Sequence, residues 1–368
     1  MSHASAMARE RFTVLDGMRG VAALVVITDH VQSATLMALL PGRYLAVDFF
    51  FALSGFVLAH VYGERLASGM PLRDFMRVRL IRLYPLYLFA TLAGALLLFA
   101  SLAKGWVDAS ATQVAGTLLF GLALLPTPPS LAVFGAPFAL NGPAWSLFFE
   151  LLVNIFYALT APRLTWRVLT GLLVVSGALL AAAAFWFGRL DVGFLWSNLA
   201  GGFPRVAFAF FAGIVVYRLR GAWRAPALPA WACVLAMLAI FMVPAAGSLR
   251  PAFDLLAAMV LFPLLIAFAA NARSAGRMLS IYAGMGLISY GIYVLQTPVR
   301  DWTYLLLDKF APGADIAGAA RVAIVAAATI AAAALLHMVY DLPVRRFLTR
   351  LKPAAPIAPA PSTTPTQS

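Results

Sequence analysis

Long apolar runs, separated by short polar or basic stretches, dominate the chain. In stretches such as 169–188 the apolar side chains occupy every helical face, whereas the helix of a soluble protein would keep one face polar. About 20 such residues are enough for one helix to cross a bilayer. The pattern predicts an all-α, polytopic bundle of transmembrane helices from eleven candidate segments: 14–40, 44–62, 83–103, 112–126, 144–161, 168–187, 201–218, 227–246, 252–270, 279–298 and 317–340.

Composition supports a membrane protein. Of the 368 residues, 63% are hydrophobic and 11% charged, whereas soluble globular domains are about 25% charged. The net charge of +13 sits in short clusters between apolar segments, so we expect these clusters to face membrane lipids and set orientation, with no nucleic-acid partner. The single cysteine, Cys233, lies within an apolar run, which excludes a disulfide framework and a cysteine-based metal site.

The distribution of lysine and arginine between the two sides of the membrane distinguishes a ten-span from an eleven-span arrangement. If the short segment 112–126 does not cross and both termini are cytoplasmic, 18 of the 27 basic residues fall in inner connections, six in outer ones and three within spans. Cytoplasmic loops carry such an excess. We therefore predict about ten spans, with 112–126 as a re-entrant or interfacial helix on the outer side, before a Pro/Gly-rich loop at 127–142.

Three regions follow from this pattern. Residues 1–13 lack the separate short apolar core of a cleavable signal peptide, so we predict a cytoplasmic leader. Residues 14–350 form one integral membrane domain. The Pro/Ala/Thr-rich segment 351–368 is predicted to be a disordered tail. No internal repeat is evident, which gives no support to a transporter built from inverted halves.

Ionisable residues within spans are costly and therefore functional candidates. The first segment contains Asp16, Arg19, Asp29 and His30. Eleven residues separate Arg19 from His30, which turns the helix about 20° past three full turns, so both project from one face roughly 16 Å apart. Asp16 is expected to be a helix N-cap, and Asp29 points about 100° away from His30. A buried, neutral imidazole bonded to a neighbouring helix is the alternative for His30.

Two further groups precede or begin later spans. Arg79 and Arg82, at i and i+3 of a basic loop, can hold phosphate oxygens together, although a basic inner loop is expected in any case and these residues alone favour anchoring at the membrane surface. Glu150 has no basic partner within one helical turn, so it is either paired with another span or protonated. Ser146 lacks a nucleophile elbow and is expected to cap or donate a hydrogen bond.

Six motifs in order along residues 12–350 resemble the membrane acyltransferase 3 family. They are Leu15-Asp16-Gly17-Met18-Arg19-Gly20 followed by His30; Val47-Asp48-Phe49-Phe50-Phe51-Ala52-Leu53-Ser54-Gly55-Phe56; Arg79-Leu80-Ile81-Arg82-Leu83-Tyr84-Pro85; Trp145-Ser146-Leu147 with Glu150; Ile288-Ser289-Tyr290-Gly291-Ile292-Tyr293; and Tyr340-Asp341-Leu342-Pro343. Each motif alone is weak, but the ordered set is specific.

The resemblance implies an enzyme that moves an acyl group, such as acetyl, from cytoplasmic acyl-CoA to a carbohydrate hydroxyl. A cell-surface polysaccharide or glycoconjugate at a bacterial inner membrane is the expected acceptor. The resemblance also implies that Arg19, His30, Arg79 and Arg82 are site residues. We expect no metal, because no cluster of His, Asp and Glu has ligand spacing.

The mechanistic hypothesis assigns these residues to two substrates. Arg79, Arg82 and Arg19 would hold the phosphates of acetyl-CoA. His30, with an ordinary pKa near 6.5, would act as general base on the acceptor hydroxyl, or carry the acyl group transiently. Glu150 completes the predicted catalytic set with His30 and Arg19. The predicted acceptor-binding residues are Asn141, Trp145, Ser146 and Asp48.

Two departures from the family pattern stand out. Gln296 occupies a position where relatives often carry histidine, and Asp341 stands where glutamate is common. A proton-coupled transporter or exporter of a sugar-containing substrate, with no covalent chemistry, is the main alternative, and an inactive membrane scaffold is a third. The sequence leaves the sugar, the size of the acyl group and the oligomeric state open.

Overall fold

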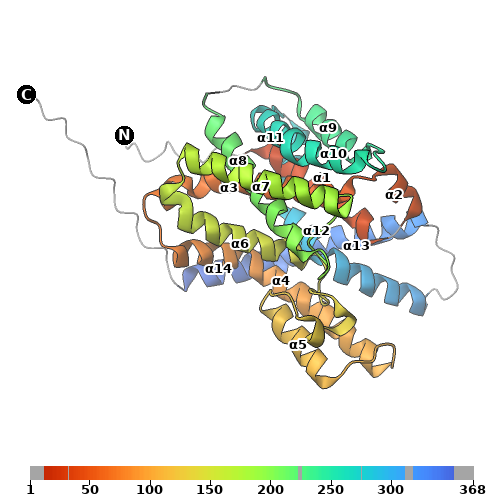
Figure 1. Cartoon of the computed structure of the whole chain (residues 1–368). Helices are drawn as coiled ribbons and strands as arrows, with labels where there is room; N and C mark the ends of the chain where they lie inside the picture. The colour runs from red at the N-terminus through yellow and green to blue at the C-terminus, as the bar shows by residue number, and fades with distance from the viewer. Residues whose placement is uncertain (1–11, 32, 223–225, 275, 311–317, 352–368) are drawn as a thin grey trace, which may run out of the picture.

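The computed structural model describes residues 12–31, 33–222, 226–274, 276–310 and 318–351 (Figure 1). This part of the chain is mostly helical and holds no β-strand, only an isolated bridge between Pro229 and Arg273. The prediction of an all-α helix bundle is confirmed. The predicted leader and tail fall almost entirely outside the described residues.

Most helices follow one another with short connections, and the two longest connections are 123–143 and 188–201. Their bounds are α1 (Thr13–His30), α2 (Ala34–Leu39), α3 (Ala46–Ala67), α4 (Leu72–Ala103), α5 (Ala111–Leu122), α6 (Ala144–Thr160), α7 (Trp166–Phe187), α8 (Gly202–Leu219), α9 (Ala230–Met242), α10 (Leu249–Leu256), α11 (Phe262–Asn271), α12 (Arg277–Phe310), α13 (Gly318–Leu336) and α14 (Leu342–Arg350). Helices α10 and α11 join through a π-helical turn, Ala257–Leu261, and α13 and α14 join through a second one, His337–Asp341.

Eight helices of the described part are long and apolar enough to cross a membrane, against about ten predicted spans. The two remaining predicted spans correspond to α1 and α9. Helix α1 carries three charged residues within 18 positions. Helix α9 has 13 residues, a length of about 20 Å, whereas the apolar core of a bilayer is about 30 Å thick. Helix α5 has only 12 residues, in line with its prediction as an optional, non-crossing segment.

Three predicted boundaries are wrong in ways that affect the site. The first predicted segment, 14–40, is two helices, because α1 ends at His30 and α2 begins at Ala34. Helix α4 begins at Leu72, so the predicted basic loop before 83 is helical. Helix α12 continues about three turns beyond the predicted end at 298, since Pro298 is accommodated inside the helix.

Small residues allow the closest helix contacts. Helix α1 packs along α12, and α3 packs along α8. At the second contact a Cβ on Gly55 would strike the Phe210 carbonyl, and a Cβ on Gly213 would strike the Ala52 carbonyl. The two glycines therefore let the α3 and α8 backbones touch, which is how helices associate in membranes when apolar burial gives no net driving force.

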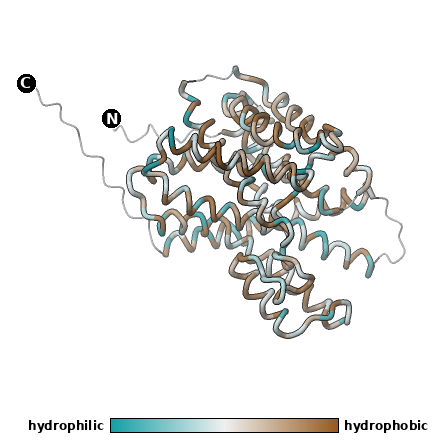
Figure 2. The backbone as a smooth tube through the Cα atoms, in the orientation of Figure 1, coloured by the Kyte–Doolittle hydropathy of each residue, from teal (hydrophilic) through white to brown (hydrophobic). Residues whose placement is uncertain are grey.

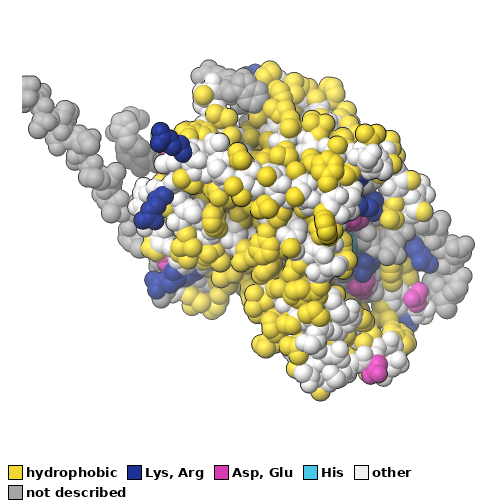
Figure 3. All heavy atoms as spheres, viewed as in Figure 1, with side chains coloured by type: hydrophobic (Ala, Val, Ile, Leu, Met, Phe, Trp, Pro, Cys, Tyr) yellow, Lys and Arg dark blue, Asp and Glu magenta, His cyan; other side chains and the backbone are white. Residues whose placement is uncertain are grey.

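Large apolar side chains cover the outer surface of the bundle. Figure 2 shows apolar residues along most helices, and Figure 3 shows them over the visible face. Helix α7 exposes Val174, Val175, Leu179, Phe185 and Trp186, the last with 84% of its surface accessible. In water such a face would be an aggregation hazard, whereas in lipid it is the expected boundary.

Proline explains both π-helical turns. Pro263 and Pro343 each stand two residues after a π turn ends. Proline has no N–H and its ring meets the carbonyl four residues earlier, so the preceding turn widens rather than forming regular α-helical bonds. The turn before Pro343 directs Asp341 and the start of α14 toward α4, with which α14 is in contact.

Candidate functional site

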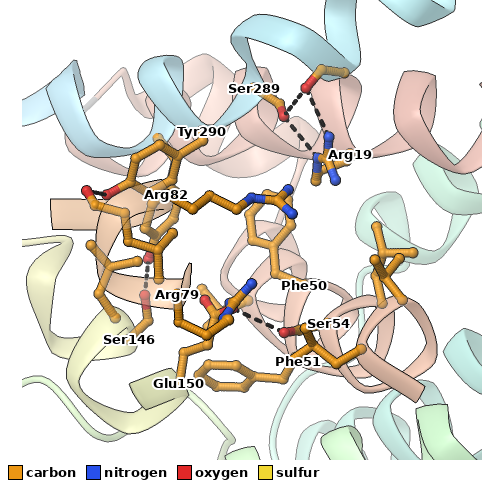
Figure 4. A pocket seen from close by; sticks show the side chains of 18 of the residues that line it. Arg19, Phe50, Phe51, Ser54, Arg79, Arg82, Ser146, Glu150, Ser289 and Tyr290 are labelled. Carbon is orange, nitrogen blue, oxygen red and sulfur yellow. Dashed lines mark hydrogen bonds and ion pairs between the residues drawn. The ribbon is translucent and has the colours of Figure 1, made fainter. Parts of the chain in front are cut away.

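A cavity of about 140 Å³ lies among α1, α3, α4, α6, α12 and α14 (Figure 4). Apolar residues of α3, including Phe50 and Phe51, form one wall. We call it the arginine cavity because four guanidiniums line it. Its polar lining consists of Arg19, Ser54, Arg79, Arg82, Ser146, Glu150, Ser289, Tyr290, Tyr293 and Arg345. The six helices thus bring together side chains from nearly the full length of the chain.

Glu150 is paired with a residue of another span, which is the first of its two predicted alternatives. Its Oε1 lies 2.5 Å from Arg79 Nη2 and accepts a second hydrogen bond from Ser54 Oγ at 2.9 Å. The Arg79 side chain is only 5% exposed and that of Glu150 20%. A buried cation needs a counter-ion, and this pair fixes α4 against α6. Arg79 Nε makes no hydrogen bond with the described residues.

Arg19 is held on three sides at the other wall of the cavity. Its Nη2 contacts Asp16 at 3.0 Å and donates to the Gly286 carbonyl at 2.8 Å, while its Nε donates to Ser289 Oγ at 2.8 Å. Asp16 is not the helix N-cap that was expected, because α1 begins at Thr13. It lies in the first turn and fixes the orientation of Arg19.

Arg82 and Arg345 lie at the more exposed part of the arginine cavity. Arg82 extends into the cavity from α4 and forms no ion pair or hydrogen bond with the described residues (Figure 4). Arg345 comes from α14 and pairs with Asp341 at 2.7 Å. Sequence reasoning missed Arg345. The signal was present, since Asp341 of the last motif has Arg345 four residues later, on the same helical face.

Ser146 and Tyr293 form a hydrogen-bonded pair in the lining. Their hydroxyl oxygens are 2.6 Å apart, and Ser146 also donates to the Pro143 carbonyl at 3.2 Å. Ser146 thus hydrogen-bonds, as expected, and belongs to the cavity. Asn141 lies beyond this pair, buried, with its Nδ2 donating to the Val294 carbonyl at 3.2 Å.

The structure places Asp48 and Trp145 outside the lining of the arginine cavity. Asp48 binds Arg205 with both carboxylate oxygens, at 3.1 and 2.7 Å, and each side chain is 1% exposed. Trp145 is 8% exposed and packs between Phe51 and Phe149, with the Arg205 guanidinium 5.3 Å from its ring centre. Both residues therefore support the fold around α3, α6 and α8.

His30 also lies outside this cavity, at the opposite end of α1 from Arg19. Its Nδ1 is 3.1 Å from the Val26 carbonyl, and its own carbonyl accepts from Arg300 Nη1 at 2.9 Å. A carbonyl only accepts, so Nδ1 carries the proton of this bond and Nε2 of the neutral ring keeps a free lone pair. The predicted shared face of Arg19 and His30 leaves them separated by about three turns, roughly 16 Å along the helix.

Unpaired polar atoms occupy the region between the arginine cavity and His30. Because Arg19 contacts Ser289 and His30 contacts Arg300, α1 and α12 run parallel. The intervening part of α12 carries Gln296 and Thr297. Three buried oxygens here have no hydrogen-bond partner among the described residues: Asn141 Oδ1, Gln296 Oε1 and Thr297 Oγ1. Such groups are costly when unmet and mark a place for a polar ligand or water.

A larger cavity of about 810 Å³ lies between α4, the loop before α6 and the last turns of α12. We call it the Trp106 cavity; Lys104, Trp106, Asp301, Tyr304 and Asp308 are among its lining residues. It lies at the His30 end of α1, since the Tyr304 hydroxyl is 3.5 Å from the carbonyl that follows His30. Asp301 is paired with Arg300, the residue that contacts His30, at 2.6 Å.

The other described histidines have structural neighbours. His60 packs against Phe12 and Tyr217, and His337 Nδ1 lies 3.3 Å from Asp341. No group of three or more His, Cys, Asp or Glu side chains in the described ranges is arranged to hold a metal ion.

Comparisons with known proteins identify relatives along almost the whole chain. The family described as an acyltransferase domain matches residues 12–338. "Acyltransferase MdmB" of Streptomyces mycarofaciens is 29% identical over 96% of both chains. "Protein 2 in picA locus" of Rhizobium radiobacter is 42% identical over 48% of this chain and 95% of its own. No solved structure matches.

Proposed function

The chain belongs to the acyltransferase domain family, and from this premise we propose that it transfers an acyl group, such as acetyl, from acyl-CoA to a carbohydrate hydroxyl. It is an integral membrane acyltransferase. The observation that carries the choice of donor is the arginine cavity, where four guanidiniums face one carboxylate, Glu150. Guanidiniums are the groups that proteins use to grip phosphate oxygens in fixed geometry.

The donor's phosphates would bind at the arginine cavity. Arg82 supplies a guanidinium with no competing partner among the described residues. Arg79 and Arg19 are ion-paired, but each guanidinium has five N–H groups, so each keeps donors after binding Glu150 or Asp16. Glu150 orients Arg79, and its partner Ser54 fixes the carboxylate in turn.

The donor's flexible arm would then reach toward His30. The arm of coenzyme A contains amide groups, whose N–H donors match the unpaired oxygens of Asn141, Gln296 and Thr297. Gln296 keeps this hydrogen-bonding capacity where relatives often carry histidine. The Ser146–Tyr293 hydrogen bond lies between the two regions and would open to let the arm pass.

His30 would act as the general base in this proposal. The bond from Nδ1 to the Val26 carbonyl leaves Nε2 free to take the proton from the acceptor hydroxyl. The hydroxyl oxygen attacks the thioester carbonyl carbon, the carbon–sulfur bond breaks, and the coenzyme A sulfur leaves with the proton returned from the imidazole. The products are the ester and free coenzyme A. A route through an acyl-imidazole uses the same Nε2 atom.

The carbohydrate acceptor would approach through the Trp106 cavity. Aromatic rings stack on the C–H faces of sugars, and carboxylates accept bonds from their hydroxyls. Trp106 and Tyr304 provide rings, and Asp301 and Asp308 provide carboxylates, at the His30 end of α1. Trp145, the ring predicted for this role, is enclosed by other aromatic residues.

Labelled acetyl-CoA tests the proposal. Membranes from cells that produce the chain are incubated with it, and label is followed into the carbohydrate fraction. We expect label with the wild type and with His60→Phe, which keeps a ring between Phe12 and Tyr217 and lines neither cavity, and none with His30→Ala. Equal label with His30→Ala would remove His30 from the mechanism. Sugar uptake driven by a proton gradient, with no label in any sample, would favour a transporter instead.

A further inference from the structure

The last helix, α14 (Leu342–Arg350), lies beyond the residues that the family model matches. The match ends at residue 338, within the π-helical turn His337–Asp341. Single π turns in helices often occur at functional sites. Here the turn brings Asp341 inward, where the residue is 1% exposed, and turns α14 along α4.

Asp341 is the centre of a small side-chain network. Its Oδ2 lies 2.7 Å from Arg345 Nη2 and 3.3 Å from His337 Nδ1. Each partner is four residues away, one on either side, so one carboxylate holds both helix turns that flank Pro343. The ion pair with Asp341 holds the Arg345 guanidinium in place. Arg345 belongs to the last helix, α14, and its side chain lines the arginine cavity.

The arginine cavity carries a net positive charge, which favours the binding of an anion. Its four arginines and Glu150 leave a charge of +3 at the lining, and the two carboxylates behind it, Asp16 and Asp341, reduce this to +1. Arg82 is the guanidinium with no carboxylate partner among the described residues, and it repels each of the other three electrostatically. A bound anion at Arg82 would relieve all three repulsions.

Exposure separates this cavity into a deep and a shallow part. The Arg79 side chain is 5% exposed and tied to Glu150, whereas the Arg345 side chain is 25% exposed and Arg82 is exposed. The Arg19 side chain is 23% exposed, but its bonds to Asp16, Gly286 and Ser289 already hold it. An anion of higher charge is more costly to desolvate, so it fits better at the shallow pair. A phosphomonoester carries about −2, against about −1 for each group of a phosphodiester or pyrophosphate bridge.

We propose that Arg82 and Arg345 form a phosphomonoester subsite, which binds the 3′-phosphate of the coenzyme A donor, and that Asp341 is the positioning residue for Arg345. The inference rests on the function proposed above. It assigns a role to Arg345, which lies outside the matched residues and outside the six motifs. It also predicts a preference among donors: the chain distinguishes coenzyme A from its 3′-dephospho form.

Binding of the two ligands to the full chain in lipid nanodiscs tests this subsite without an acceptor. The wild type is expected to bind coenzyme A at least about tenfold more tightly than 3′-dephospho-coenzyme A, the range for charge-assisted hydrogen bonds. Arg345→Ala should weaken coenzyme A binding roughly tenfold to a hundredfold and change dephospho-coenzyme A binding less than about twofold. Arg345→Lys, which keeps the charge but loses the planar fork, should fall between.

Asp341→Asn provides the positioning test, and Arg346→Ala provides the matched control. Loss of the charged partner should weaken coenzyme A binding in the same selective way, whereas a merely structural defect would weaken both ligands equally. Arg346 is exposed and outside the cavity lining, so Arg346→Ala should change the binding affinity of neither ligand. Equal weakening of both ligands in the Arg345 variants, or equal binding of both by the wild type, would overturn the subsite. Failure of the wild type to bind either ligand would instead refute the coenzyme A donor.

Discussion

Asp48 and Arg205 allow the sharpest energetic prediction, because both side chains are 1% exposed and their geometry is bidentate. Asp48→Asn removes the negative charge and one of the two accepting oxygens. The amide nitrogen that replaces it presents N–H groups to a guanidinium that has only N–H groups, while Arg205 remains buried. Removing one partner of a buried ion pair costs about 3–5 kcal/mol.

A double variant that removes both charges tests the same pair. The loss of stability expected for it depends on two carbonyls to which Arg205 also donates. Its Nη1 bonds the Val192 carbonyl at 2.6 Å and its Nη2 bonds the Tyr44 carbonyl at 3.3 Å. Asp48→Leu with Arg205→Met removes both charges, yet leaves the buried Val192 carbonyl without this donor at about 1–3 kcal/mol and takes from the Tyr44 carbonyl one of its hydrogen bonds, the other coming from the Ala46 N–H. We therefore expect the double variant to be about as unstable as Asp48→Asn, and not restored to the wild-type level.

Equilibrium unfolding in mixed micelles, followed by tryptophan fluorescence, measures these free energies. Asp191→Asn is the matched control, since the Arg189–Asp191 pair is exposed by 45% and 26%, and such pairs contribute about 0–1 kcal/mol. A change below about 1 kcal/mol for Asp48→Asn would refute the reasoning. Normal stability with a selective loss of acceptor binding would instead return Asp48 to the substrate site, where sequence reasoning placed it.

Two further variants address the site and the packing. Glu150→Gln should raise the KM for acetyl-CoA at least about tenfold and change kcat less, because Arg79 loses the charged partner that orients it for the donor's phosphates. Steady-state kinetics that show an unchanged KM would contradict this. Gly55→Ala should reduce the yield of folded protein in size-exclusion chromatography, because the added methyl group meets the Phe210 backbone, whereas Gly171→Ala, which meets open space, should not. Similar yields for the two glycine variants would contradict the close α3–α8 contact.

Local sequence signals located the helices well, but they found a helix end only where the apolar run and the helix end together. Apolar runs predicted α6, α7 and α8 to within two residues, because each is bounded by polar, proline or glycine residues. The start of α4 was missed by eleven residues, since its first turns are basic rather than apolar. Arginine and leucine have high helix propensity, so these turns form a helix, but a hydropathy pattern does not detect a helical turn made of charged residues.

The sequence by itself determined that the chain is a bundle of apolar helices, and it named four charged members of the arginine cavity, Arg19, Arg79, Arg82 and Glu150, since an ionisable group in an apolar helix is costly unless it has a purpose. Only the tertiary structure decided their partners. Arg79 meets Glu150 across 71 positions, and Arg345 joins Arg82 from the last helix, while Asp48 and Trp145 face away. Such pairings depend on how each helix is rotated and crossed against its neighbours, which side-chain packing over the whole bundle sets and no local pattern encodes.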